Sequence, residues 1–110
     1  MKLPRYKEAI VPKQKLTKYL LSETHAVGSA KAKFFRNLGF NLSNVDELKK
    51  AFLKIVQTNE VKKRRKFEYG INYVVEGIVE APNGKRVIIT TVWFVKSSEG
   101  RPRFVTAYPV

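Results

Sequence analysis

The sequence predicts an α+β fold in which three N-terminal helices precede a four-stranded antiparallel sheet. Up to about residue 58, apolar residues recur at helical spacing, whereas beyond it they alternate with polar residues or run without a break, as in strands. Short turn-forming segments separate these strand-like stretches, which favours a meander with the helices on one face. Because 110 residues are the size of one domain, we expect a single domain over 1–110, helical over about 12–58 and a sheet over about 59–109.

Three segments carry helical signals after an irregular or extended start. Pro12 suits the first position of a short helix ending near Leu21, because its missing N–H would be unpaired there in any case. Ser29 is a candidate N-cap for a short, basic helix that Gly39 closes. Ser43, followed by two carboxylates, opens a third helix. The expected apolar faces are Leu16, Tyr19 and Leu20 in the first helix, and Val45, Leu48, Phe52, Ile55 and Val56 in the third.

The strand signals follow in order. Apolar residues alternate over 73–80, and Pro-Asn-Gly at 82–84 predicts a hairpin turn. The nearly continuous β-branched and aromatic stretch 87–95 predicts a central strand, with Tyr73 and Trp93 in the core rather than free for stacking. The last strand runs over 103–108. Pro109 is expected to stop it.

The charge is strongly positive, with 22 Lys+Arg against 9 Asp+Glu and a net charge of +13. Such a surface attracts polyanions, so nucleic acid is the first candidate partner. Positive charge is densest in five consecutive cations, Lys62, Lys63, Arg64, Arg65 and Lys66, which we call the basic run. In a strand its side chains would point to both faces, which places it at a sheet edge. It is either a ridge that binds phosphates or a solvated edge that prevents aggregation between sheets.

Several classes of chemistry are disfavoured. The chain has no Cys and one His, which leaves no thiolate or histidine cluster for a metal. Neither a glycine-rich phosphate loop nor an Asp-x-Asp metal motif occurs, so we expect no metal and no nucleotide cofactor. No apolar run approaches a membrane span, and the N-terminal residues lack the apolar stretch of a signal peptide. We therefore expect a cytoplasmic protein without a membrane partner.

His25 is the one side chain with an ordinary pKa near neutrality, and it precedes the basic second helix. Free N–H groups at the start of that helix form an anion site, which Lys31 and Lys33 would supplement. The alternative is a surface histidine in a loop beside ordinary helix lysines.

Thr106 and Tyr108 are expected to share one face of the last strand with Phe104, because residues two apart point the same way. A tyrosine ring stacks on bases, and a threonine hydroxyl binds phosphate oxygens or base edges. The alternative is ordinary cross-strand packing with a threonine facing solvent.

Five phrases carry a resemblance that covers nearly the whole chain: residues 25–40, Tyr69-Gly70, residues 81–86, Thr91-Val-Trp93 and residues 102–109. They resemble a small uncharacterised bacterial family found alone and as a C-terminal domain of larger toxins. That family is similar to the Barnase–EndoU–colicin–RelE superfamily of metal-independent ribonucleases. The similarity lies in helices before a four-stranded sheet, a His near the helices and a closing Thr-x-Tyr-Pro.

This resemblance implies a bacterial ribonuclease toxin that cleaves RNA by attack of the ribose 2′-OH on the adjacent phosphate. His25 would act as base or acid, Lys31 and Thr106 would hold the phosphate, and Tyr108 would contact a base. Arg103 and the basic run would follow the RNA backbone. The sequence departs from the two-histidine pattern, so either Lys31, Tyr108 or substrate water takes the second proton-transfer role, or the enzyme is slow or inactive. The implied partner besides RNA is an acidic antitoxin or immunity protein.

Two further hypotheses stay open. One is a basic nucleic-acid-binding domain without catalysis, in which the sheet face grips single strands or structured RNA. The other is an adaptor domain whose charge serves an acidic protein partner. Growth arrest on expression would separate the toxin from both.

Overall fold

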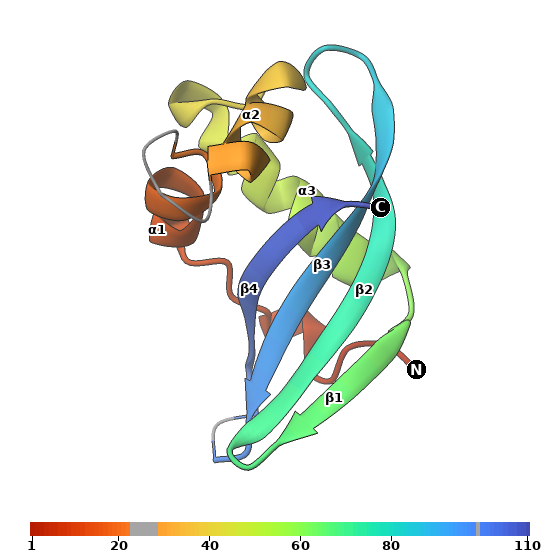
Figure 1. The fold of residues 1–110 in the computed structure, drawn as a ribbon. Coiled ribbons are helices and arrows are strands. Elements are labelled where there is room, and N and C mark those ends of the chain that lie inside the picture. Colours follow the sequence, from red (N-terminus) through yellow and green to blue (C-terminus); the bar gives the residue numbers. More distant parts are fainter. Residues whose placement is uncertain (23–28, 99) are drawn as a thin grey trace.

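The computed structural model describes residues 1–22, 29–98 and 100–110, and in these ranges the expected α+β class is confirmed (Figure 1). The helices come first: α1 (Lys13–Lys15), which continues as a π-helical turn over Leu16–Leu20, then α2 (Ser29–Asn37) and α3 (Val45–Thr58). Short 3₁₀ turns cover Tyr6–Glu8 and Leu42–Asn44. The strands are β1 (Lys63–Phe67), β2 (Gly70–Glu80), β3 (Arg86–Lys96) and β4 (Pro102–Pro109). None of the described helices is long and apolar enough to cross a bilayer.

Two helix starts differ from expectation. Pro12 is the N-cap of α1, with extended backbone, and not its first helical residue. Ser43 does not open α3, because the Asn41 and Asn44 side chains cap the 3₁₀ turn before it. Asn41 Oδ1 accepts from the Ser43 N–H at 2.8 Å, while Asn44 Oδ1 accepts from the Asn41 N–H at 2.8 Å. Asn44 also donates to the Gly39 carbonyl at 2.9 Å, so the cap is tied to the preceding turn in a way that a serine hydroxyl is too short to achieve.

The strands pair antiparallel in the order β1-β2-β3-β4, as the meander predicts. The stretch 87–95 therefore lies in an inner strand, and Tyr73 and Trp93 are buried in the core. The basic run lies at a sheet edge, because Lys63–Phe67 form the exposed edge strand β1. On the opposite edge, Ile10 forms a bridge with Arg103 and covers the start of β4. Pro109 is the last residue of β4 rather than a stop before it.

Strand β4 contains a bulge at Val105. Val92 pairs with Thr106 and Trp93 pairs with Phe104, which leaves Val105 without a partner on β3. An extra residue in one strand reverses the side-chain alternation beyond it. Phe104 therefore points into the core with 2% of its surface exposed, whereas Thr106 and Tyr108 point to the other face. The expectation that Phe104 shares their face is wrong, because alternation alone ignores the bulge.

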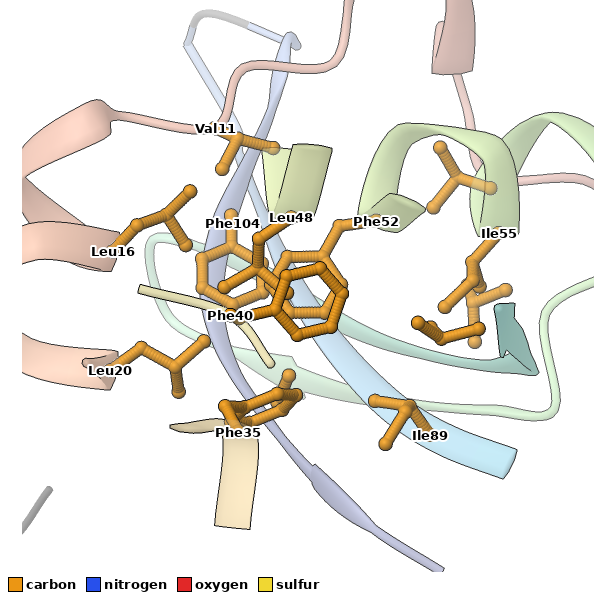
Figure 2. Packing of buried hydrophobic residues seen from close by; sticks show 14 of the residues in the cluster. Val11, Leu16, Leu20, Phe35, Phe40, Leu48, Phe52, Ile55, Ile89 and Phe104 are labelled. Atoms are coloured by element: carbon orange, nitrogen blue, oxygen red, sulfur yellow. The ribbon is translucent and has the colours of Figure 1, made fainter. Parts of the chain in front are cut away.

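The core holds these elements together mainly through aromatic side chains (Figure 2). Phe52 of α3 stacks on Phe104 with the ring centroids 4.9 Å apart, and Phe35 of α2 meets Phe52 edge-on at 5.9 Å. Each buried phenylalanine side chain contributes about 1.5–3 kcal/mol to stability. The α2 helix is thus anchored to the same cluster as β4, which fixes the distance between their polar residues.

Candidate functional site

Three polar side chains from distant parts of the chain meet beside β4. We call Tyr19, Lys31 and Thr106 the polar triangle. Lys31 Nζ donates to Tyr19 Oη at 2.9 Å and to Thr106 Oγ1 at 3.0 Å. Tyr19 Oη and Thr106 Oγ1 are themselves 3.1 Å apart and hydrogen-bonded. All three contacts are partly buried, so they are shielded from full competition by water.

Local structure explains why these side chains converge. Leu16 and Leu20 are fully buried and hold the π-helical turn that carries Tyr19. Phe35 lies one helical turn after Lys31 in α2, so its burial directs the Lys31 face of the helix toward β4. Ala107 is buried on the core face of β4, which turns its neighbour Thr106 outward. Single π-helical turns are rare in proteins, and many of those that occur lie at functional sites.

Two tyrosine rings flank Lys31. Its Nζ lies 5.5 Å from the ring centre of Tyr19 and 5.8 Å from that of Tyr108. Lys15 Nζ approaches the Tyr19 ring at 5.6 Å. Cation–π contacts of this kind are worth about 0.5–1 kcal/mol at exposed sites. Tyr108 is 37% exposed, so part of its ring remains accessible to a ligand.

The environment of Tyr19 shifts its acidity. Partial burial alone raises its pKa, but the hydrogen bonds from Lys31 and Thr106 and the charges of Lys31 and Lys15 outweigh this effect. The pKa of Tyr19 therefore lies below the ordinary tyrosine value of about 10. The triangle makes Tyr19 a stronger acid and stabilises the phenolate that it forms on losing a proton.

Five of the predicted site residues divide into three groups. Lys31, Thr106 and Tyr108 come together as expected. His25 lies outside the described residues. Lys33 is exposed on α2, about 200° around the helix from Lys31 and therefore on another face.

Tyr19 is the residue that sequence reasoning misses. Its spacing predicts a place on the apolar face of the first helix, and its ring does pack against the core. Its hydroxyl instead reaches Thr106, 87 positions away in the chain. The usable signal in the sequence is a tyrosine in a lysine-rich turn, but nothing there connects it to the last strand.

The basic residues are divided between the two faces of the sheet. We call the face that carries Thr106 and Tyr108 the outer face, since the core residues point to the opposite side. The ladder Arg65–Asn72–Phe94–Arg103 crosses this face, and Lys63 pairs with Val74 in the next ladder. Lys63, Arg65 and Arg103 therefore share the outer face with Thr106.

The other members of the basic run behave differently. Arg64 and Lys66 pair with Tyr73 and Ile71, whose side chains point to the core side of the sheet. Lys62 precedes β1 and donates to Glu76 at 2.9 Å. The hydrogen bond from Lys62 lowers the pKa of Glu76, and partial desolvation opposes it only in part.

A hollow of about 460 Å³ lies between α3 and the β2–β3 hairpin, and no member of the polar triangle lines it. Among the described residues, no three His, Cys, Asp or Glu side chains gather as a metal site requires. At the β4 edge, by contrast, a tyrosine of lowered pKa is hydrogen-bonded to a lysine and a threonine, and an accessible tyrosine ring lies against the same lysine.

Fold and site together define a basic α+β domain with a lysine–hydroxyl cluster at one edge of an antiparallel sheet. The family profile of DUF6883, a domain of unknown function, matches residues 2–110, and the chain belongs to this family. This confirms the predicted membership of a family without assigned function, whereas the relation to the ribonuclease superfamily stays a prediction.

The comparison with solved structures identifies a similar fold. A chain of the contact-dependent growth inhibition toxin and immunity protein complex from Klebsiella pneumoniae 342 superimposes with a TM-score of 0.72. The two sequences are 20% identical, and the match covers 94% of this chain and 95% of that chain. No curated protein matches the sequence.

Proposed function

We propose that the protein is a metal-independent ribonuclease toxin, neutralised by an acidic antitoxin or immunity protein. The observation that carries the proposal is the polar triangle: a lysine ammonium held between two hydroxyls, beside an accessible tyrosine ring. The fold similarity to a chain of a toxin–immunity complex adds support. The charge of +13 favours the toxin side of such a complex, since a toxin must bind RNA and its neutraliser must oppose that charge.

The reaction is cleavage of RNA by its own ribose 2′-OH, which gives a 2′,3′-cyclic phosphate and a 5′-OH end. Positive charge must stabilise the phosphorane that forms, and Lys31 supplies it with the Thr106 hydroxyl beside it. The accessible ring of Tyr108 would stack on a base next to the scissile phosphate. We assign the removal of the 2′-OH proton to His25, the one imidazole in the chain.

The outer face supplies a path for the rest of the RNA. Lys63, Arg65 and Arg103 lie on the same face as Thr106 and Tyr108. Together they would bind backbone phosphates on either side of the cleaved bond.

The test is incubation of the purified protein with total RNA in EDTA, followed by mapping of the new ends. We expect discrete cleavage with cyclic phosphate ends. His25→Ala and Lys31→Gln should each lower the rate by about 10²-fold or more. The matched control is Lys49→Gln, which removes an exposed lysine of α3. Expression of the wild type should arrest growth, and His25→Ala should relieve the arrest.

A second candidate function is nucleic-acid binding without cleavage. The observation that favours it is the exposed edge strand β1, which presents cations on both faces of the sheet. Tight, salt-dependent RNA binding by a folded wild type that cleaves none of the RNAs tested would replace the ribonuclease proposal by this one.

A further inference from the structure

The proposed reaction needs two proton transfers, and the chain contains one histidine. A base must take the proton of the 2′-OH, and an acid must give a proton to the departing 5′-oxygen. If His25 is the base, the acid has to be a different side chain at the same phosphate.

Tyr19 meets the geometric requirement for this acid. Its Oη lies within hydrogen-bond distance of both groups assigned to the phosphate, 2.9 Å from Lys31 Nζ and 3.1 Å from Thr106 Oγ1. A leaving oxygen on a phosphate held by those groups is within reach of the same hydroxyl. Tyr108 differs, because it is exposed and contacts Lys31 with the face of its ring.

We infer that Tyr19 is the general acid that protonates the 5′-oxygen leaving group. This inference rests on the proposed function and adds a residue to it. The electrostatics of the triangle fit the role, since Lys31 stabilises the phenolate that remains after the transfer.

The 2′-oxygen forms a bond to phosphorus while His25 accepts its proton, and the bond between phosphorus and the 5′-oxygen breaks. The Tyr19 hydroxyl gives its proton to that oxygen, which leaves as an alcohol. Water then returns a proton to the phenolate and removes one from His25. Lys31 keeps its charge throughout and donates hydrogen bonds to the phosphate oxygens.

The experiment compares two leaving groups in one oligonucleotide that contains the cleavage site mapped in total RNA. One version has the natural 5′-oxygen at the scissile bond, and the other has a 5′-bridging sulfur. A thiolate leaves without protonation, because thiols are far more acidic than alcohols. An enzyme that has lost only its general acid therefore cleaves the sulfur version normally.

We expect Tyr19→Phe to lower kcat on the oxygen substrate by about 10²-fold or more, with KM within a few-fold of wild type. On the sulfur substrate, Tyr19→Phe and wild type should differ by less than a few-fold. The control is Tyr69→Phe, which changes an exposed tyrosine between β1 and β2. Its rates should match those of the wild type on both substrates. The ratio of the two rates is measured within one preparation, so it does not depend on the folded fraction of a variant.

The pH profile gives an independent measurement. With the oxygen substrate, the rate of the wild type should fall at high pH as the Tyr19 phenol ionises. This limb should be absent with the sulfur substrate.

Equal loss on both substrates would make Tyr19 a positioning residue and overturn its role as the acid. Unchanged activity of Tyr19→Phe would remove it from the mechanism. A folded wild type that cleaves neither substrate would overturn the ribonuclease proposal itself, and the acid with it.

Discussion

Phe104 and Thr106 lie on opposite faces of β4 although only Val105 separates them. The bulge at Val105 lets one short strand serve two purposes. Phe104 stacks on Phe52 in the core, while Thr106 binds Lys31 and Tyr19 at the sheet edge. The position of the site therefore depends directly on the packing beneath it.

Phe104→Ala should destabilise the fold by about 3–5 kcal/mol, the usual cost of truncating a buried phenylalanine. The loss combines the transfer free energy of the ring with the cavity left against Phe52 and Trp93. Urea denaturation measures it. Phe67→Ala, which truncates a ring 42% exposed on β1, is the control and should change stability by much less. Similar losses in both variants would contradict the anchoring role of Phe104.

The phenol of Tyr19 should titrate below the ordinary tyrosine value. The difference between the ultraviolet pH titrations of wild type and Tyr19→Phe isolates its phenol. Its midpoint should lie below about 10, because the hydrogen bonds and charges of the triangle outweigh the effect of burial. Lys31→Met should move this midpoint upward. A midpoint at or above the ordinary value in the wild type would show that burial dominates.

The same pKa predicts how stability depends on pH. The pKa of Tyr19 is lower in the folded state than in the unfolded chain, so the folded state binds fewer protons between the two values. The contribution of Tyr19 to stability is therefore complete above the unfolded pKa and is lost as the pH falls through the folded pKa. Urea midpoints of wild type relative to Tyr19→Phe should rise with pH across that window, and a falling difference would refute the sign.

The two faces of β1 should differ in RNA binding. Lys63 and Arg65 share the outer face with Thr106, whereas Arg64 and Lys66 point to the other side. Replacing the first pair by glutamine should flatten the slope of log K against log salt by about 1.4, or about 0.7 for each single-strand phosphate contact. Replacing Arg64 and Lys66 by glutamine should change this slope less. If both pairs leave it unchanged, the basic run is a solvated edge.

Tyr108 should contribute through its ring. Tyr108→Phe keeps the aromatic face and should bind RNA like the wild type, while Tyr108→Ala should lose about 1–3 kcal/mol of stacking. Melting temperatures recorded alongside separate this loss from unfolding. Equal losses of affinity in two folded variants would assign the role to the hydroxyl.

The elements that follow from local patterns could be predicted, and those that depend on distant contacts could not. Hydrophobic periodicity and turn residues give the helices and the strand order, and the run of five cations gives the edge position of β1. The bulge at Val105 and the cap by Asn41 leave no periodic signal, because each is decided by the fit to neighbouring elements.

The site was predictable to a similar extent. Lys31, Thr106 and Tyr108 follow from residue chemistry and a family resemblance, and they do come together. Tyr19 could not be placed, because its helical spacing indicates packing and its partner lies at the other end of the chain. Only the three-dimensional packing of the π-helical turn against β4 reveals it.

The span between Tyr19 and Thr106 has a consequence during protein synthesis. The ribosome produces Tyr19 early and Thr106 87 residues later, so the triangle is incomplete until translation passes the last strand. The β4 partner of Ile10 also arrives at that stage. Closing contacts over such long stretches is slow relative to forming local helices. A prematurely terminated chain that stops before Thr106 consequently lacks a corner of the polar triangle and cannot assemble it.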